Sequence, residues 1–284
     1  MKRIFTLGII LCAALTGFAQ VDTTGKQNQP TESDTIKVGG MIIIRKPGGG
    51  REVVRDRRDR DSTMPRRKYS KPSNVSTNWW ILDLGFSNYN DQTNYVNALA
   101  SDFTGTGVNE ETMKLKTWKS RNVNIWFFMQ KLNVVKHVIN LKYGLGLELN
   151  NYHFDDNRIH LSENPTKITL DPNYEGLDKN KLAADYITVP LMLNINFTPG
   201  RGRGFGISGG VSAGYLYSSR QKIKNGGDKD KTHDDFDLRK WKISYVGELI
   251  LGPVKLYGSY ATQSMWEKGL DQTPYTVGAR FANW

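Results

Sequence analysis

Cysteine and long apolar stretches are scarce in this chain of 284 residues. The single cysteine, Cys12, lies in an apolar segment, residues 4–15, which follows two basic residues and precedes the small residues Gly17 and Ala19. A basic start, a short apolar segment and a small-residue end are typical of a secretory signal peptide. Residues 1–19 are therefore predicted to be removed, which would leave a mature chain without disulfides or a catalytic thiol.

Beyond residue 20 the sequence has no run of the 18 or so apolar residues that a membrane-spanning helix needs. This excludes a helical membrane protein. An exported chain without such a helix has three destinations, which are the periplasm, the outer membrane and the outside of the cell.

Eight stretches of alternating apolar and polar residues occupy residues 77–284. The links between them are long and short by turns, and the last stretch ends in aromatic residues, Phe281 and Trp284. In a transmembrane β-barrel one face of each strand meets lipid, the other meets the lumen, and the two rims carry loops of different length. The pattern predicts an all-β fold, an eight-stranded antiparallel transmembrane β-barrel in the outer membrane, with strands near residues 78–87, 123–130, 139–150, 186–197, 205–217, 240–251, 254–262 and 275–281.

The less apolar face of these stretches carries charges of both signs. A soluble eight-stranded barrel would place apolar residues inside and polar residues outside, which is the reverse of what lipid requires. The charges are predicted to pair inside the lumen as a network of Asp83, Lys142, Glu148, Lys242, Glu248, Lys255 and Arg280. Because side chains just fill the interior of an eight-stranded barrel, no large open channel is expected.

The links predict which rim faces which compartment. Short links near residues 131–136, 198–203 and 252–253 are expected on the periplasmic side, and long links near residues 88–112, 151–182 and 219–237 outside. An even strand count places both ends of the barrel in the periplasm. Pro190 lies in the middle of the fourth stretch, where a missing N–H predicts a local bulge.

Residues 20–76 differ in composition from the rest of the chain. They are rich in Gly, Pro, Ser, Thr, Asn and Gln, so they are predicted to form a disordered basic arm in the periplasm. Residues 37–71 hold twelve Lys or Arg against four Asp or Glu. The arm is either a solvated linker or a contact to an anionic surface through Arg55, Arg57, Arg58, Arg66, Arg67 and Lys68. Nucleic acid is not an expected partner, since the export signal takes the chain away from it.

One apolar island interrupts the arm, and it consists of Met41, Ile42, Ile43 and Ile44. Such a β-prone segment can dock as an added strand on the sheet of a periplasmic or envelope protein. A small hairpin without further role is the alternative.

A family resemblance rests on residues 186–193, Tyr-Ile-Thr-Val-Pro-Leu-Met-Leu, and on the glycine-rich residues 204–215. Both segments resemble the PorT-like outer-membrane β-barrel family of Bacteroidetes. The resemblance implies a small integral barrel, and the association of the founding member with protein secretion suggests a related role.

Three classes of function remain. A non-enzymatic interaction, assembly or secretion-associated component is preferred, with outer-membrane lipid as a partner and with no catalytic residue, metal or cofactor. A narrow channel for small solutes is the alternative. A rim enzyme is the third, and its candidate groups are His153 with Asp155 and Asp156, His160, and His233 with Asp234 and Asp235.

Overall fold

The computed structural model describes residues 35–38, 41–45, 51–55, 73–199, 204–226 and 228–282. The chain divides into two compact units, residues 1–70 and 71–284. The predicted signal peptide and most of the predicted arm lie outside the described residues.

The first unit contains a three-stranded antiparallel sheet. Its strands are β1 (Thr35–Val38), β2 (Met41–Arg45) and β3 (Arg51–Arg55), and β2 is the central strand. Three segments of the predicted arm thus form strands, and disorder of the rest of the arm stays a prediction. The apolar island finds backbone partners on both sides, Ile43 opposite Ile36 and opposite Val53, which is one strand more than the small hairpin of the alternative.

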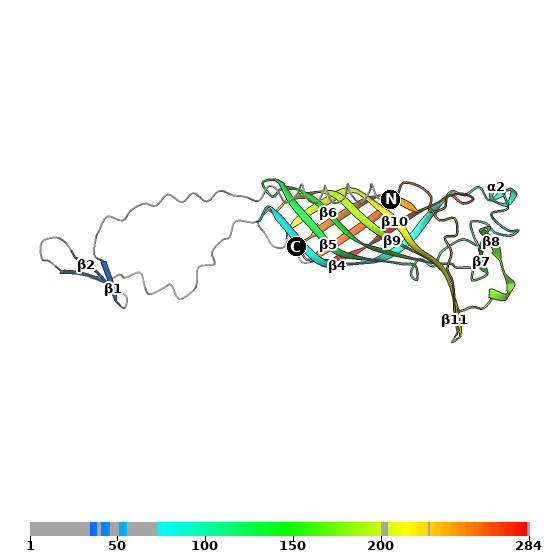
Figure 1. The fold of residues 1–284 in the computed structure, drawn as a ribbon, viewed down its shortest axis with the longest axis horizontal. Coiled ribbons are helices and arrows are strands. Elements are labelled where there is room, and N and C mark those ends of the chain that lie inside the picture. Colours follow the sequence, from blue (N-terminus) through cyan, green and yellow to red (C-terminus); the bar gives the residue numbers. More distant parts are fainter. Residues whose placement is uncertain are drawn as a thin grey trace, which may run out of the picture. The chain divides into compact units, whose positions relative to one another are not determined.

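The second unit contains the predicted eight antiparallel strands, and they close into a ring (Figure 1). Each strand pairs with its neighbours in the chain, and the last strand pairs with the first to complete the barrel. The strands are β4 (Val75–Asp91), β5 (Arg121–Val135), β6 (Ile139–His153), β9 (Lys179–Asn196), β10 (Phe205–Asn225), β12 (Trp241–Leu251), β13 (Val254–Ala261) and β14 (Gln272–Phe281).

The two ends of the barrel differ, as the link lengths predicted. At one end, here called the turn end, short links join β5 to β6, β9 to β10 and β12 to β13. At the other, the loop end, the links contain α2 (Tyr95–Ala100), β7 (Ile159–Ser162), β8 (Lys167–Leu170), η1 (Pro172–Tyr174) and β11 (Asp228–Thr232). β9 and β10 have 18 and 21 residues, about twice the 9–11 that cross a bilayer, so they extend beyond it.

The outer face of the barrel is apolar and is bounded by aromatic side chains at both ends. Exposed aliphatic residues such as Ile187, Val189, Ile207 and Val277 form the middle band. The aromatic residues are Trp79, Trp80, Phe197, Phe205 and Phe281 toward the turn end, and Phe86, Trp118, Tyr215, Tyr217, Trp241, Tyr245, Tyr260 and Tyr275 toward the loop end. Two aromatic girdles around an apolar band are the surface that a barrel needs in a membrane.

Two local features depart from simple alternation or from the predicted bulge. The ladder between β5 and β6 shifts register between Trp126 and Phe128, and the extra residue turns Met129 inward, whereas a strict period of two residues from Val123 would place it on the lipid side. Pro190 produces no bulge, since the register between β6 and β9 is the same on both sides of it. Pairs are missing only opposite Val189 and Pro190, as the missing N–H of proline explains.

Among the described residues, no helix is both long and apolar enough to pass through a membrane.

Candidate functional site

The inside of the barrel holds a charge cluster that begins at the seam between the first and last strands. Asp83 on β4 lies directly opposite Arg280 on β14. Arg280 donates from Nε to Asp83 Oδ1 at 2.7 Å and from Nη2 to Oδ2 at 2.8 Å. Asp83 also accepts from the indole of Trp126 at 2.7 Å and from the amide of Asn124 at 3.2 Å. This bidentate hydrogen bonding is the strong form of an ion pair. The side chains of Arg280 and Asp83 are both nearly inaccessible to solvent.

Arg280 connects this pair to a second carboxylate, that of Glu248. Its Nη1 lies 3.5 Å from Glu248 Oε2, and the ammonium of Lys142 lies 2.8 Å from the same oxygen. Ser208 donates to that oxygen at 3.2 Å. Four of the predicted residues therefore form one chain, in the order Asp83, Arg280, Glu248, Lys142.

A separate pair lies nearer the loop end, where Lys242 donates to Glu148. Asn150 and Thr188 also donate to Glu148, at 3.1 and 3.4 Å. The ammonium of Lys242 lies 4.7 Å from the ring centroid of Tyr186, which adds a cation–π contact.

Lys255, the seventh predicted residue, is placed apart from these pairs. Its ammonium donates to the backbone carbonyl of Ala282 at 2.7 Å, and within the described residues it has no ion pair with a carboxylate. The structure thus brings six of the seven charged residues into two clusters.

Uncharged polar side chains complete the network, and the sequence reading missed them. The amide of Asn122 donates to Asn124 and to Asn150, both at 2.9 Å, and Tyr257 donates to Asn122 at 2.5 Å. Asn140 donates to Asn194, which donates to Ser208. The sequence does contain a signal for them, because asparagines recur on the inward face of β5, β6 and β9.

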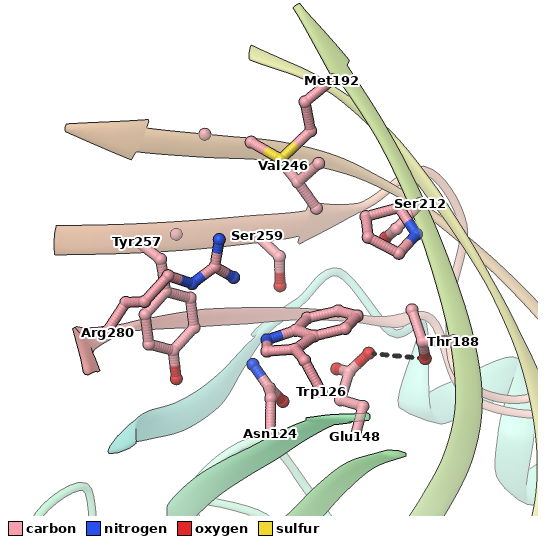
Figure 2. Close-up of a pocket in the computed structure, with 13 residues that line it drawn as sticks. Asn124, Trp126, Glu148, Thr188, Met192, Ser212, Val246, Tyr257, Ser259 and Arg280 are labelled. Carbon is pink, nitrogen blue, oxygen red and sulfur yellow. Dashed lines mark hydrogen bonds between the residues drawn. The ribbon is translucent and has the colours of Figure 1, made fainter. Parts of the chain in front are cut away.

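A small cavity lies between some of these side chains. A cavity of about 30 Å³ lies among Trp126, Glu148, Thr188, Tyr257 and Arg280 (Figure 2). That volume holds about one water molecule. Figure 2 shows side chains from several strands of the ring converging on it.

The loop end has a hydrophobic core of its own, to which the three long links, the moderate link between β13 and β14, and the ends of the strands contribute. Its members are almost fully buried and include Phe103, Phe154, Ile159, Leu161, Ile168, Phe236, Leu238, Trp266 and Leu270. Trp266 donates from its indole to Gln272 at 2.9 Å, and Gln221 bonds to the backbone of Ile159 and Leu161. We call this packed structure the cap.

The candidate enzyme groups do not come together in the predicted way. Asp155 lies 3.9 Å from Lys116, and Asp156 pairs with Arg158 at 2.6 Å, so both carboxylates serve cations rather than His153. Burial, and then the neighbouring lysines, lower the pKa of His153 to about 4.

The other two histidines are no better placed for catalysis. His160 contacts the hydroxyl of Tyr174 at 3.1 Å. His233 is exposed beside the open depression that Asp234 and Asp235 also line. In the part of the chain that the structure describes, no group of three or more His, Cys, Asp or Glu could hold a metal ion.

Most of the arm residues that are predicted to contact an anionic surface lie outside the described residues. Arg55 is the last residue of β3, whereas Arg57, Arg58, Arg66, Arg67 and Lys68 lie outside the described residues. Their contact with an anionic surface stays a prediction, as does docking through residues 41–44.

Comparison with known proteins agrees with this architecture. The family model described as "Outer membrane protein beta-barrel domain" matches residues 82–256, more than half of the chain. The chain therefore belongs to this family of outer-membrane β-barrel proteins. The narrower PorT-like assignment stays a prediction.

One similar solved structure is the crystal structure of Ail, the attachment invasion locus protein of Yersinia pestis. It is 11% identical, with a TM-score of 0.32, and the match covers 74% of this chain and 100% of the Ail chain. No curated protein matches the sequence.

Proposed function

We propose that this protein is a closed anchor in the outer membrane that presents its cap and its N-terminal arm to partners, as a non-enzymatic interaction or assembly component. The proposal rests on the observation that a path through the barrel is obstructed at two places, in the lumen and at the loop end. Inside the barrel, ion pairs link Asp83, Arg280, Glu248 and Lys142, and the cavity beside them holds only about 30 Å³. The loop end is covered by the hydrophobic core of the cap.

The runner-up, a narrow solute channel, fits these observations less well. A conducting path would have to open both the Asp83–Arg280–Glu248–Lys142 chain and the cap. A rim enzyme is disfavoured because the carboxylates beside His153 are engaged with Lys116 and Arg158.

The proposal includes an orientation, with the loop end outside the cell and the turn end and arm in the periplasm. Barrels of this class carry short turns on the periplasmic side and longer loops outside. With an even number of strands, β4 begins and β14 ends at the same rim. The arm would then reach periplasmic or envelope partners, and the PorT-like resemblance suggests a link to secretion.

Cysteine labelling tests this orientation. Glu163→Cys places a thiol on the exposed link between β7 and β8, and Lys136→Cys places one on the turn between β5 and β6. Apart from Cys12 in the predicted signal peptide, the sequence offers no competing thiol. A membrane-impermeant maleimide should label Glu163→Cys on intact cells and Lys136→Cys only after lysis. The opposite pattern would contradict the orientation.

The arm is tested by deleting residues 41–44. If β2 is part of a docking sheet, its loss should remove co-purifying envelope proteins while the barrel still folds. An unchanged set of co-purifying proteins would reject docking through this segment.

A further inference from the structure

The extension of the barrel wall beyond the loop end carries an ordered array of lysines. Three Lys-x-Lys segments occur on three adjacent strands, Lys179 and Lys181 on β9, Lys222 and Lys224 on β10, and Lys229 and Lys231 on β11. The register places Lys181, Lys222 and Lys231 side by side in one row. A second row contains Lys179, Lys224 and Lys229.

All six lysines lie on one face of the sheet. Directly opposed residues point the same way, and residues two apart in a strand share a face. The residues between them, Asn180, Ile223 and Asp230, point to the other face. Asn180 is buried there and donates to the backbone of Asn157 and Ile159 in the cap. Asp and Lys alternate along β11, so its lysines lie on one face of the sheet and its aspartates on the other.

Little in the described residues neutralises this lysine array. Asp178, 3.4 Å from Lys224, is the one carboxylate that forms an ion pair with it there. Arg220, next to the array on β10, is already paired with Asp185 at 2.6 Å. Burial, and then the charges of Lys179, Lys222 and Arg220, lower the pKa of Lys181 to about 8.

Such an arrangement costs stability. Like charges placed directly opposite one another on neighbouring strands are destabilising, and here the repulsion is repeated across two rows. The contacts of Lys224 with Asp178 and of Lys181 with the side chain of Asn151 offset only part of this repulsion. The array therefore points to a ligand that supplies negative charge.

The array lies on the same side of β9 as the lipid-facing surface, and the buried residues Ala183 and Asp185 lie between the two. Lys179 and Lys181 share the face of β9 that carries Ile187 and Val189 in the apolar band, because no bulge interrupts β9 between them. From Ile187 to Lys181 the strand rises about 20 Å, at roughly 3.3 Å per residue. Figure 1 shows the β10–β11 hairpin turning aside from the long axis of the barrel. A ribbon that bends away from the barrel wall turns its outer face toward the membrane plane.

We propose that this lysine array binds the phosphate groups of a phosphorylated saccharide lipid in the outer leaflet. The inference rests on the proposed orientation, with the loop end outward. A phosphate-bearing saccharide headgroup stands above the apolar band, at the level of the array, and supplies several negative charges at fixed spacing. Each lysine near an anionic membrane surface contributes to binding, and the attraction fades with salt.

The test compares two triple variants of the full-length protein in detergent. Lys222→Gln/Lys224→Gln/Lys231→Gln removes half of the array. The matched control, Lys114→Gln/Lys240→Gln/Lys268→Gln, removes as many exposed loop-end lysines outside it. Fluorescently labelled lipopolysaccharide is titrated against each protein and against wild type. The array variant should bind at least about tenfold more weakly, the control within about twofold of wild type, and dephosphorylated lipopolysaccharide should bind wild type poorly.

Other outcomes would overturn the inference. Equal binding by wild type and the array variant would reject it, and so would equal binding of dephosphorylated lipopolysaccharide. Competition by polyglutamate at equal charge would instead indicate an acidic protein, and displacement by micromolar inorganic phosphate would indicate a free-anion site. These results leave the anchor proposal intact, because maleimide labelling and channel recording test that separately.

Discussion

Replacing Arg280 with methionine is expected to destabilise the folded barrel by about 3–5 kcal/mol, as for other buried ion pairs that lose one partner. The guanidinium holds two carboxylates, Asp83 at 2.7 Å and Glu248 at 3.5 Å, and both are almost inaccessible to solvent. Methionine fills similar space but leaves Asp83 without a cation. The change should appear in urea unfolding of the full-length protein in lipid vesicles.

Two further variants identify the cause of that loss. Lys268→Met removes an exposed ion pair with Asp237 and should cost at most about 1 kcal/mol. Adding Asp83→Asn to Arg280→Met removes the stranded charge and should recover part of the stability. If the free energy of unfolding of Arg280→Met lies within about 1 kcal/mol of the wild-type value, the loss is no larger than that of an exposed pair. That result would show that the lumen pairs do not support the barrel.

A second large effect is expected from Gly278→Val, which should prevent the barrel from closing. Gly278 lies on the seam opposite Gly85, and the ring of Tyr257 packs over both. A side-chain carbon at Gly278 would collide with the carbonyl of Leu84, would lie 2.5 Å from Gly85 Cα, and would meet the Tyr257 ring at 2.7 Å. Since backbone cannot yield as a flexible side chain does, the cost should exceed the roughly 1–3 kcal/mol of ordinary overpacking.

The matched control is Gly209→Val on the outer face of β10. A carbon added at Gly209 meets nothing within 4 Å, so this variant should fold nearly as wild type does. The measurement is the fraction of protein that shows heat-modifiable migration on a gel after outer-membrane fractionation. Equal fractions for the two variants would show that the seam does not require glycine at position 278.

Alternation in the sequence was sufficient for the strands and for most of the lumen. The inward positions of Lys142, Glu148, Lys242 and Glu248 follow from a period of two residues along β6 and β12. Met129 could not be placed, because the bulge beside Phe127 depends on how β5 pairs with β6 rather than on the pattern of β5 alone.

Which charged side chains pair with one another inside the lumen depends on how the ring of strands closes. Asp83 and Arg280 are 197 positions apart, and they meet because the last strand pairs with the first in one register. A single strand carries no information about that register. The pairing of Glu248 with Lys142 across the lumen is equally invisible in the sequence.

In the cap and in the lysine array too, the residues are visible in the sequence but their arrangement is not. The apolar residues Ile159, Leu161 and Ile168 are visible in a long link, but their packing into one core with Phe103 and Trp266 depends on the tertiary fold. The three Lys-x-Lys segments are also visible. Only the register of β9, β10 and β11 turns them into one face.

Conductance tests the closed anchor most directly. Purified full-length protein is inserted into planar bilayers, and current is recorded under an applied voltage. A lumen filled by the Asp83–Arg280–Glu248–Lys142 chain and covered by the cap predicts no stable open state. Reproducible steps of porin size from the wild-type protein would contradict the account.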